Sequence, residues 1–241
     1  MDGSVLITGA SSGFGKACAE KFAEEARPLV LAARRLDRLE QLKSELEKKA
    51  PVHVLELDVR NRKMVEQAVA GLPESFGNID VLINNAGLAR GLEPSHKADL
   101  DDWETMIDTN IKGLIYCARS VLPQMVARNQ GHIVNLGSIA GDWPYPGGNV
   151  YGATKAFVKQ FSRNLRCDLA GTRVRVTNIE PGIAETEFSV VRFAGDADKA
   201  GSVYKNTEPL TAQDIADIIH WVVSVPGHVN INRVEVMATF Q

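Results

Sequence analysis

The amino-acid sequence predicts an α/β protein: a single doubly wound domain with a seven-stranded parallel sheet and helices on both faces. Three observations predict it. Short β-branched runs alternate with longer amphipathic stretches along the whole chain, which is typical of βαβ units. A glycine-rich turn follows the first strand. No repeat or low-complexity linker divides residues 1–241, so we expect one domain with one core.

Seven strands are predicted, several of them as continuous apolar runs, as expected for strands that helices cover on both sides. They are Ser4–Ile7, Leu29–Ala33, Val52–Leu57, Val81–Asn84, His132–Leu136, Val174–Ile179 and Val234–Met237. Helices are predicted between them, with apolar residues recurring at three and four positions. They are Lys16–Glu25, a stretch carrying Leu39, Leu42 and Leu46, Arg62–Ala70, Asp101–Arg128, Tyr151–Ala170 and Ala212–Ser224. Right-handed crossovers then place helices on both faces.

One long segment lacks a clear period. Residues 183–210 carry several glycines and aspartates and one proline. Long connections of this kind in compact domains often cover active sites, so we expect a lid over the substrate at about 183–210.

Composition excludes several classes of protein. The chain has 27 Lys and Arg against 30 Asp and Glu, a net charge of −3, which argues against a nucleic-acid binder. No apolar run approaches the roughly 20 residues that cross a bilayer, and the N-terminus lacks a secretory leader. We therefore expect a cytoplasmic protein with no membrane or nucleic-acid partner. Cys18, Cys117 and Cys167 are widely spaced and are expected to be reduced packing residues.

The glycine-rich turn predicts a nucleotide site. It reads Thr8-Gly9-Ala10-Ser11-Ser12-Gly13-Phe14-Gly15 and stands between the first strand and the first helix. Gly9 permits the tight turn, Gly13 lets the backbone approach a pyrophosphate, and Gly15 allows close packing of helix on strand. The free N–H groups of the helix N-terminus face the anion. Ser11, Ser12 and Phe14 fall within the same turn and are expected to line it.

The second strand indicates which dinucleotide binds. It ends at Arg34 and Arg35, where an NAD enzyme of this architecture would carry an acidic residue for the ribose hydroxyls. Two guanidinium groups suit a 2′-phosphate, so NADP(H) is the expected cofactor. The alternative is a solvated basic helix start, because Arg38 follows closely.

A serine, a tyrosine and a lysine form the expected catalytic group. Ser138 follows the fifth predicted strand, and Tyr151 and Lys155 lie four residues apart on a predicted helix. That spacing places both side chains on one helix face. A neighbouring ammonium favours the phenolate and is expected to bring proton transfer by Tyr151 toward neutral pH. Ser138 can hydrogen-bond the oxygen on which charge develops during hydride transfer.

With these motifs the chain resembles the short-chain dehydrogenase/reductase family over essentially its whole length. The resemblance implies further roles. Asp58 and Val59 contact the adenine, and Asn110 orients a water that links Lys155 to solvent; a buried Asn that closes a helix kink would look the same. Lys155 and Tyr151 also hold the nicotinamide ribose. The remaining cofactor contacts implied are Asn85, Gly87, Pro181, Gly182, Ile183 and Thr186.

A narrower resemblance concerns the substrate. The stretches 85–89, 103–110, 147–157 and 228–232 look like the bacterial NADP-dependent 3-hydroxy acid dehydrogenases, also described as serine or allo-threonine dehydrogenases and malonic semialdehyde reductases. Those enzymes are tetramers that oxidise small β-hydroxy acids, so the resemblance implies a homotetramer. The sulfoacetaldehyde reductases, which form isethionate in taurine metabolism, share the same frame and remain the alternative.

Candidate substrate residues come from two loops. Arg90 stands where the hydroxy acid dehydrogenases usually carry an apolar residue, and Arg192 lies on the expected lid; either guanidinium can fix a carboxylate or sulfonate. Tyr145 lies on the loop beside Ser138 and is expected to wall the pocket. The chain ends at Gln241, where relatives carry a longer tail that can reach a neighbouring subunit.

The leading hypothesis is therefore an NADP(H)-dependent oxidoreductase that interconverts a small acidic aldehyde or keto acid with its hydroxy acid. The five histidines lack metal-binding spacing, so no metal site is expected. The competing hypothesis is a non-catalytic NADP-sensing protein that has kept the fold and lost the chemistry. The presence of Ser138, Tyr151, Lys155 and Asn110 argues against it.

Overall fold

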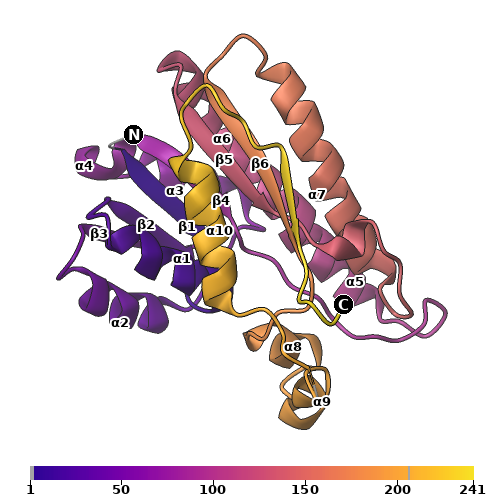
Figure 1. Ribbon diagram of the computed structural model, residues 1–241. Coiled ribbons are helices and arrows are strands. Elements are labelled where there is room, and N and C mark those ends of the chain that lie inside the picture. Colours follow the sequence, from indigo (N-terminus) through magenta and orange to yellow (C-terminus); the bar gives the residue numbers. More distant parts are fainter. Residues whose placement is uncertain (1–2, 206) are drawn as a thin grey trace.

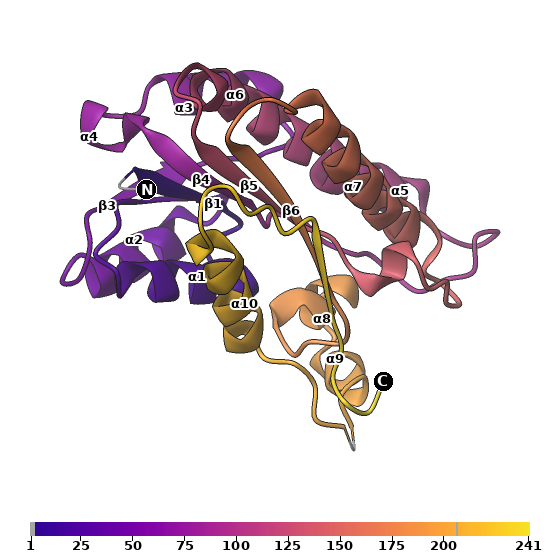
Figure 2. The same cartoon turned by 45° about the horizontal axis from the view of Figure 1, so that its top comes forward.

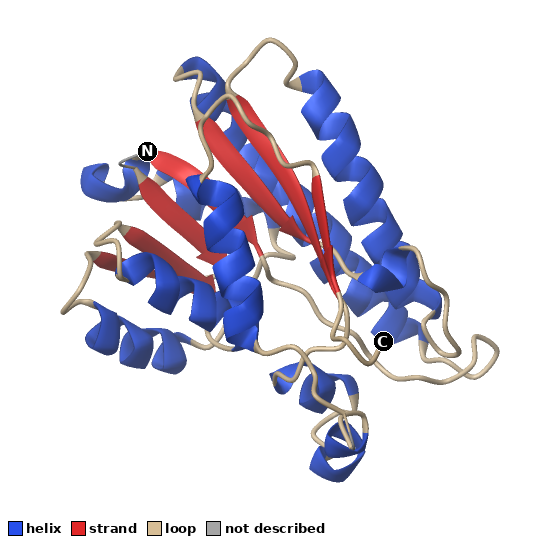
Figure 3. Ribbon diagram, in the orientation of Figure 1, coloured by secondary structure: helices blue, strands red, loops and turns tan. Residues whose placement is uncertain are grey.

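The computed structural model describes residues 3–205 and 207–241. Within them, parallel strands form one sheet in the order β3-β2-β1-β4-β5-β6-β7 (Figure 3). The strands are β1 Ser4–Thr8, β2 Leu29–Ala33, β3 Val52–Glu56, β4 Ile79–Asn84, β5 Gly131–Leu136, β6 Val174–Pro181 and β7 Arg233–Val236. The predicted fold class is confirmed. The strand order reverses between β1 and β4, and in open α/β sheets ligands bind at the carboxyl ends of the strands beside such a reversal.

Helices cover both faces of the sheet (Figures 1 and 2). One face carries α1 Gly13–Ala23, α2 Leu36–Leu46 and α10 Ala212–Ser224. The other carries α3 Arg62–Ala70, α6 Leu114–Ala127 and α7 Asn149–Asp168, with α5 Leu100–Ile107 beside α7. A single turn, α4 Glu74–Gly77, precedes β4 and has no counterpart in the predicted elements because four residues show no period. We find no helix in the described part of the chain with the length and apolar character of a membrane span.

The core consists of two apolar layers, one on each side of the sheet. Ile7 of β1 packs with residues of α1, α2 and α10, whereas its neighbour Leu6 packs with residues of α3, α6 and α7. Successive strand side chains point to opposite faces, so a strand that is buried on both sides favours apolar residues at consecutive positions. This is why the strand sequences show continuous apolar runs.

The helix predicted at Asp101–Arg128 is interrupted. After α5 the chain forms a π-helical segment, η1 Asp108–Gly113, before α6 continues. Such widened turns occur frequently at functional sites. The apolar periodicity of the sequence does not reveal the widened turn, because the turn shifts the helical phase without breaking the helix.

The segment predicted as an irregular lid contains two short helices, α8 Glu187–Arg192 and α9 Ala197–Ser202. Thr186 and Asp196 cap them by accepting hydrogen bonds from backbone N–H groups. The two ends of the segment are tied together by a parallel bridge between Ala184 and Leu210. Residue 206 of the predicted lid lies outside the described residues. Figure 1 places α8 and α9 beyond the carboxyl ends of the strands.

An ion-pair cluster ties β7 to the loop after β5. Arg233 of β7 pairs through Nε with Oε2 of the buried Glu180 at 2.5 Å and through Nη2 with Oδ2 of Asp142 at 2.5 Å, and it also pairs with Glu235. Lys159 of α7 forms a further ion pair with Asp142. Burial raises the pKa of Glu180, and Arg233 opposes that rise. The carboxylates of Asp142, Glu180 and Glu235 lie close together, and Lys159 and Arg233 form ion pairs with them.

The three cysteines are free, as predicted, but only two are packing residues. Cys18 of α1 and Cys117 of α6 are buried, and burial raises the pKa of both thiols, that of Cys117 to about 12. Cys167, near the end of α7, is exposed to solvent, so the prediction that it packs in the core is wrong. Its place in the last turn of a surface helix explains the difference.

Candidate active site

The glycine-rich turn has the backbone geometry that its sequence predicts. Gly9 and Gly13 have φ values of +67° and +53°, in the left-handed region that favours glycine. A Cβ atom on Gly15 would lie 2.4 Å from the carbonyl oxygen of Gly9, so only glycine allows this approach of α1 to the turn. The helix begins at Gly13, three residues earlier than predicted.

A side-chain network fixes the turn against the loop after β4. Asn85 donates through Nδ2 to the carbonyl oxygens of Thr8 and Gly9, at 2.9 and 3.1 Å. Thr8 Oγ1 accepts from the backbone N–H groups of Asn85 and Ala86, at 3.1 and 3.0 Å. These bonds join β1 to β4 across the point where the strand order reverses. Asn85, expected by resemblance to contact the cofactor, thus shapes the turn.

The N-terminus of α1 presents hydrogen-bond donors to an anion. Ser12 is the N-cap residue, yet its side chain makes no capping hydrogen bond, and the first turn of α1 carries no acidic residue. Ser12 Oγ accepts instead from Arg35, as does Ser11 Oγ. Phe14 packs against the core beneath the turn. The free N–H groups and the neighbouring guanidinium fit the phosphates of a dinucleotide.

The two arginines after β2 point in different directions. Arg35 reaches the glycine-rich turn, donating to Ser11 Oγ at 3.1 Å and to Ser12 Oγ at 2.9 Å. Arg34 is exposed on the side of Asp58, whose pKa is lowered chiefly by hydrogen bonds from Arg60 and to a smaller extent by the Arg34 charge. Between them the arginines flank the edge of the sheet where the resemblance places the adenosine.

Glu187 of α8 is a site residue that the sequence analysis missed. Its carboxylate pairs with Arg35 Nη1 at 3.1 Å and with Arg38 Nη1 at 2.7 Å. An open hollow of about 270 Å³ lies here. It is lined by Ser11, Ser12, Gly13, Lys16, Arg38, Gln41, Leu42, Glu45 and Glu187. Arg38 is therefore part of this charged group. A pairing between residues 149 positions apart leaves no local sequence signal.

The residues predicted for the adenine contact lie at the end of β3. Asp58 accepts hydrogen bonds from the side chain of Arg60, which hold its pKa below the usual range. Val59 is buried, and a Cβ atom on Gly113 would lie 2.6 Å from its Cγ2 atom. Val59 thus packs its side chain against η1.

Ser138, Tyr151 and Lys155 converge as predicted. Ser138 follows β5; its hydroxyl accepts from the N–H of Ala140 and donates to the carbonyl oxygen of Pro181. Tyr151 and Lys155 of α7 are both buried, with Lys155 Nζ 5.8 Å from the centre of the Tyr151 ring. Lys155 Nζ donates to the carbonyl oxygen of Leu136 at 2.7 Å.

The pKa of Tyr151 shifts opposite to the direction expected from the Lys155 ammonium. Burial raises the Tyr151 pKa to about 12, whereas a hydrogen bond with Ser138 and the charge of Arg192 act to lower it. Burial also lowers the pKa of Lys155 to about 8. Desolvation therefore outweighs the Ser138 hydrogen bond and the Arg192 charge at Tyr151, because the phenol lies in the interior. The sequence could not show this burial.

Both polar atoms of the Asn110 side chain form hydrogen bonds within the protein. Its Oδ1 accepts from the N–H of Leu88 at 2.9 Å, and its Nδ2 donates to the Leu88 carbonyl at 2.8 Å and to Thr154 Oγ1 at 3.1 Å. These bonds hold the loop after β4 against η1 and α7. Gly87 lies beside them: a Cβ atom there would be 3.2 Å from Asn110 Oδ1 and 3.6 Å from Lys155 Nζ.

The remaining residues expected to contact the cofactor lie between β6 and α8. Pro181 ends β6, and Gly182 and Ile183 follow it; a Cβ atom on Gly182 would lie 2.3 Å from Gln241 Oε1. The N–H of Ile183 donates to that same oxygen at 2.9 Å. Thr186 lies beside the glycine-rich turn, since a Cβ atom on Gly13 would be 3.5 Å from its Cβ.

Of the two candidate arginines, Arg192 faces Tyr151. Its guanidinium carbon lies 5.4 Å from the ring centres of both Tyr151 and Tyr145, and its Nη2 donates to the Tyr145 hydroxyl at 2.5 Å. Arg192 Nη1 has no hydrogen-bond partner among residues 3–205 and 207–241. Arg90 donates to the carbonyl oxygen of Val191 at 3.3 Å and so contacts the backbone of α8.

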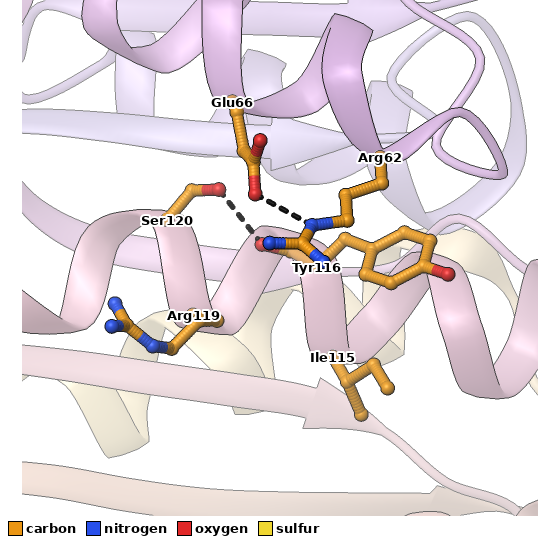
Figure 4. Close-up of a pocket in the computed structure, with 6 residues that line it drawn as sticks. All are labelled: Arg62, Glu66, Ile115, Tyr116, Arg119 and Ser120. Carbon is orange, nitrogen blue, oxygen red and sulfur yellow. Dashed lines mark hydrogen bonds and ion pairs between the residues drawn. The ribbon is translucent and has the colours of Figure 1, made fainter.

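Another open hollow, of about 280 Å³, lies between α3 and α6 (Figure 4). It is lined by Arg62, Glu66, Ile115, Tyr116, Arg119 and Ser120. Arg62 and Glu66 form an ion pair there at 2.7 Å. None of the residues predicted for catalysis or cofactor binding lines it, so the site is assigned to the strand ends instead.

Burial of the charged Lys155 side chain is expected to lower the free energy of unfolding. We expect Lys155→Met to stabilise the nucleotide-free protein at pH 7 by up to about 3 kcal/mol, because the change from 10.5 to a pKa of about 8 measures the cost of burying the charge. Below pH 8 the lysine is charged in both states and the gain is complete. Above 10.5 it is neutral in both, and the gain disappears. Thermal unfolding of both proteins across this pH range measures the effect.

Lys63→Met is the matched control, since Lys63 is exposed on α3 and should change the unfolding temperature little at any pH. If Lys155→Met destabilises the protein equally at pH 7 and pH 10, packing rather than desolvation governs this position.

The comparisons with known proteins agree with this geometry. Residues 4–196 match the short chain dehydrogenase family. The chain is 59% identical over 238 residues to the NADP-dependent 3-hydroxy acid dehydrogenase YdfG of Salmonella typhi, covering 98% of this chain and 95% of that protein. It is 54% identical over 242 residues to a sulfoacetaldehyde reductase of Chromohalobacter salexigens, covering 100% and 96%.

A solved structure is similar throughout. The closed form of serine dehydrogenase complexed with NADP+ superimposes with a TM-score of 0.96 at 56% identity, covering 99% of this chain and 96% of that one. The family match spans most of the chain, and the matched residues include the glycine-rich turn and the Ser138, Tyr151 and Lys155 group. The chain therefore belongs to the short-chain dehydrogenase family.

Proposed function

We propose that this protein is an NADP(H)-dependent oxidoreductase that interconverts a small acidic aldehyde or keto acid with its hydroxy acid. The observation that carries the proposal is the convergence on Tyr151: Ser138 hydrogen-bonds it, Lys155 lies under its ring, and the Arg192 guanidinium faces it. A proton donor and a cation thus share one small site. Relatives named for 3-hydroxy acids and for sulfoacetaldehyde support an acidic substrate.

The cofactor would be held by the glycine-rich turn and the arginines after β2, and when bound it supplies or accepts hydride. The left-handed turn, the N-terminus of α1 and Arg35 fit a pyrophosphate and a 2′-phosphate. We assign the other predicted contacts to the adenine, the phosphates and the nicotinamide ribose. They are Gly9, Ser11, Ser12, Gly13, Phe14, Gly15, Arg34, Asp58, Val59, Asn85, Gly87, Tyr151, Lys155, Pro181, Gly182, Ile183 and Thr186.

In the reducing direction Tyr151 donates its proton to the carbonyl oxygen of the substrate. Its raised pKa keeps the phenol protonated at neutral pH, as a proton donor requires. Ser138 hydrogen-bonds the same oxygen and stabilises the charge that develops on it. Lys155 lies close enough to Tyr151 to favour the phenolate once the proton has left. Asn110 keeps η1 and the loop after β4 in place beside them.

Arg192 is the stronger candidate for binding the carboxylate or sulfonate, because its guanidinium faces Tyr151 and its Nη1 has no hydrogen-bond partner within the described part of the chain. Tyr145 orients that guanidinium through its hydroxyl. Arg90 holds the backbone of the lid, residues 183–210, which we propose covers the bound substrate. The second candidate activity, sulfoacetaldehyde reduction, requires the same cation.

We also propose that the enzyme is a cytoplasmic homotetramer. Exposed apolar side chains on the neighbouring helices α5 and α7, namely Leu100, Ile107 and Phe157, support an association surface on this side of the molecule.

Direct measurement of cofactor oxidation and reduction tests the activity. NADPH oxidation is measured with malonic semialdehyde, sulfoacetaldehyde and succinic semialdehyde, and NADP+ reduction with serine, 3-hydroxypropionate and isethionate. We expect turnover with at least one acidic pair and a clear preference over NAD(H). Nucleotide binding without turnover of any of these compounds would favour the sensing hypothesis.

The cofactor assignment predicts a selective loss. Replacing both Arg34 and Arg35 with Ala should weaken NADPH binding at least tenfold, because each charge-assisted contact to a phosphate contributes about 1.5 to 3 kcal/mol. NADH lacks that phosphate, so its affinity should change little. Titration calorimetry with both nucleotides measures the effect. An equal loss for NADH and NADPH would show that the arginines support the fold rather than the 2′-phosphate.

A further inference from the structure

Glu187 joins the lid to the arginines of the cofactor site. It is the first residue of α8, and its carboxylate contacts Arg35, the N-cap residue of α2, and Arg38 in the first turn of that helix. Burial acts to raise the pKa of Glu187, but hydrogen bonds from Arg38 and Arg35 outweigh it and hold the pKa below the usual range. The carboxylate is therefore ionised at neutral pH.

Arg35 is engaged on two sides. Its Nη2 atom donates to Ser11 Oγ and Ser12 Oγ, while Nη1 pairs with Glu187 at 3.1 Å. A 2′-phosphate that binds beside the glycine-rich turn needs the same guanidinium. A carboxylate and a phosphate repel each other, so two anions cannot both be neutralised fully by the same arginine pair. The Glu187 side chain is 45% exposed and is free to turn toward solvent.

The same helix contacts the catalytic tyrosine. Thr186 lies beside Gly13 at one end of α8, the Phe188 ring lies 5.6 Å from the Tyr151 ring, and Arg192 lies at the other end. Glu187 and Arg192, the arginine proposed to bind the substrate, therefore lie on the same helix, α8. Removal of the Glu187 charge should alter cofactor affinity without removing any residue that contacts the reacting atoms.

We propose that Glu187, paired with Arg35 and with the neighbouring Arg38, is an internal counter-anion of Arg35, and that by competing with the 2′-phosphate for the Arg35 guanidinium it limits the selectivity for NADP(H) over NAD(H). This inference rests on the proposed function. NADP(H) must displace the carboxylate from the arginine pair, whereas NAD(H), which lacks the phosphate, leaves the Glu187 contacts intact. Glu187 is thus a specificity-determining residue that lies on the lid and not in the glycine-rich turn.

Two nucleotide fragments isolate this effect. Adenosine 2′,5′-bisphosphate carries the 2′-phosphate and 5′-AMP lacks it, and neither has a nicotinamide that would engage the catalytic residues. Titration calorimetry on Glu187→Gln should show the bisphosphate bound about threefold to tenfold more tightly than by the wild type, the range for losing two partly exposed ion pairs. Binding of 5′-AMP should stay within twofold. NADPH and NADH should follow the same pattern.

Glu185→Gln is the matched control. Glu185 lies two residues away, is exposed, and forms no ion pair among the described residues, so its replacement removes the same charge from the same segment. It should change neither fragment's affinity by more than twofold. In an Arg38→Met background the effect of Glu187→Gln should shrink, because one of the two competing contacts is then absent.

Two outcomes would overturn the inference. If Glu187→Gln raises the affinity for both fragments equally, the carboxylate repels any anionic nucleotide and does not compete specifically with the 2′-phosphate. If it weakens the bisphosphate, Glu187 supports the phosphate site. Failure of the proposed function looks different: wild-type protein would then show no preference for the bisphosphate over 5′-AMP.

Discussion

Tyr151→Phe should lower the turnover number by about 10² to 10⁴, the contribution of a positioned general acid, while NADPH affinity stays within about threefold. The variant removes the hydroxyl and keeps the ring, which is 8% exposed and packs 5.6 Å from Phe188. Because burial raises the Tyr151 pKa to about 12, the phenol is protonated at neutral pH, and the Arg192 guanidinium carbon lies 5.4 Å from the centre of its ring. Steady-state rates with the best acidic substrate and titration with NADPH measure the two quantities.

The matched control is Tyr116→Phe. Tyr116 belongs to α6 and lies at the hollow shown in Figure 4, so the same deletion there should leave turnover unchanged. If Tyr151→Phe retains turnover within tenfold of the wild type, another group donates the proton and the assignment of Tyr151 is wrong.

Arg192→Met should lower kcat/KM for acidic substrates by about 100-fold, equal to about 2.7 kcal/mol, because a charge-assisted contact to the carboxylate or sulfonate is lost. The methionine keeps the aliphatic stem against Tyr145 and Tyr151. Propanal has no anionic group, so its kcat/KM should change by less than about threefold. Sulfoacetaldehyde, malonic semialdehyde and propanal are compared in the wild type, Arg192→Met and Arg90→Met.

Arg90→Met serves as the comparison because Arg90 contacts the backbone of α8 and not Tyr151. It should affect charged and neutral substrates alike. If all three substrates fall together in both variants, neither arginine binds the anion. A loss confined to sulfoacetaldehyde in Arg90→Met would assign the sulfonate to Arg90 and favour the sulfoacetaldehyde reductases as the better functional match.

The sequence by itself determined the sheet and the glycine-rich turn, and it named the residues that we propose as catalytic. Strands that helices cover on both faces are mostly apolar, so β1 and β2 are visible in the sequence as nearly continuous apolar runs. The left-handed conformations at Gly9 and Gly13 likewise favour glycine at those positions. Tyr151 and Lys155 share a helix face by their spacing alone.

Only the tertiary structure decided how those residues behave. The pKa of Tyr151 rises because the interior removes water from the phenol, and burial is a property of the assembled fold. Asn110, in the widened turn, forms hydrogen bonds with Leu88 and Thr154, which come from other elements. Glu187 meets Arg38 only because α8 folds back over the glycine-rich turn. Local sequence specifies conformation within one element, whereas contacts between distant segments set charge, burial and selectivity.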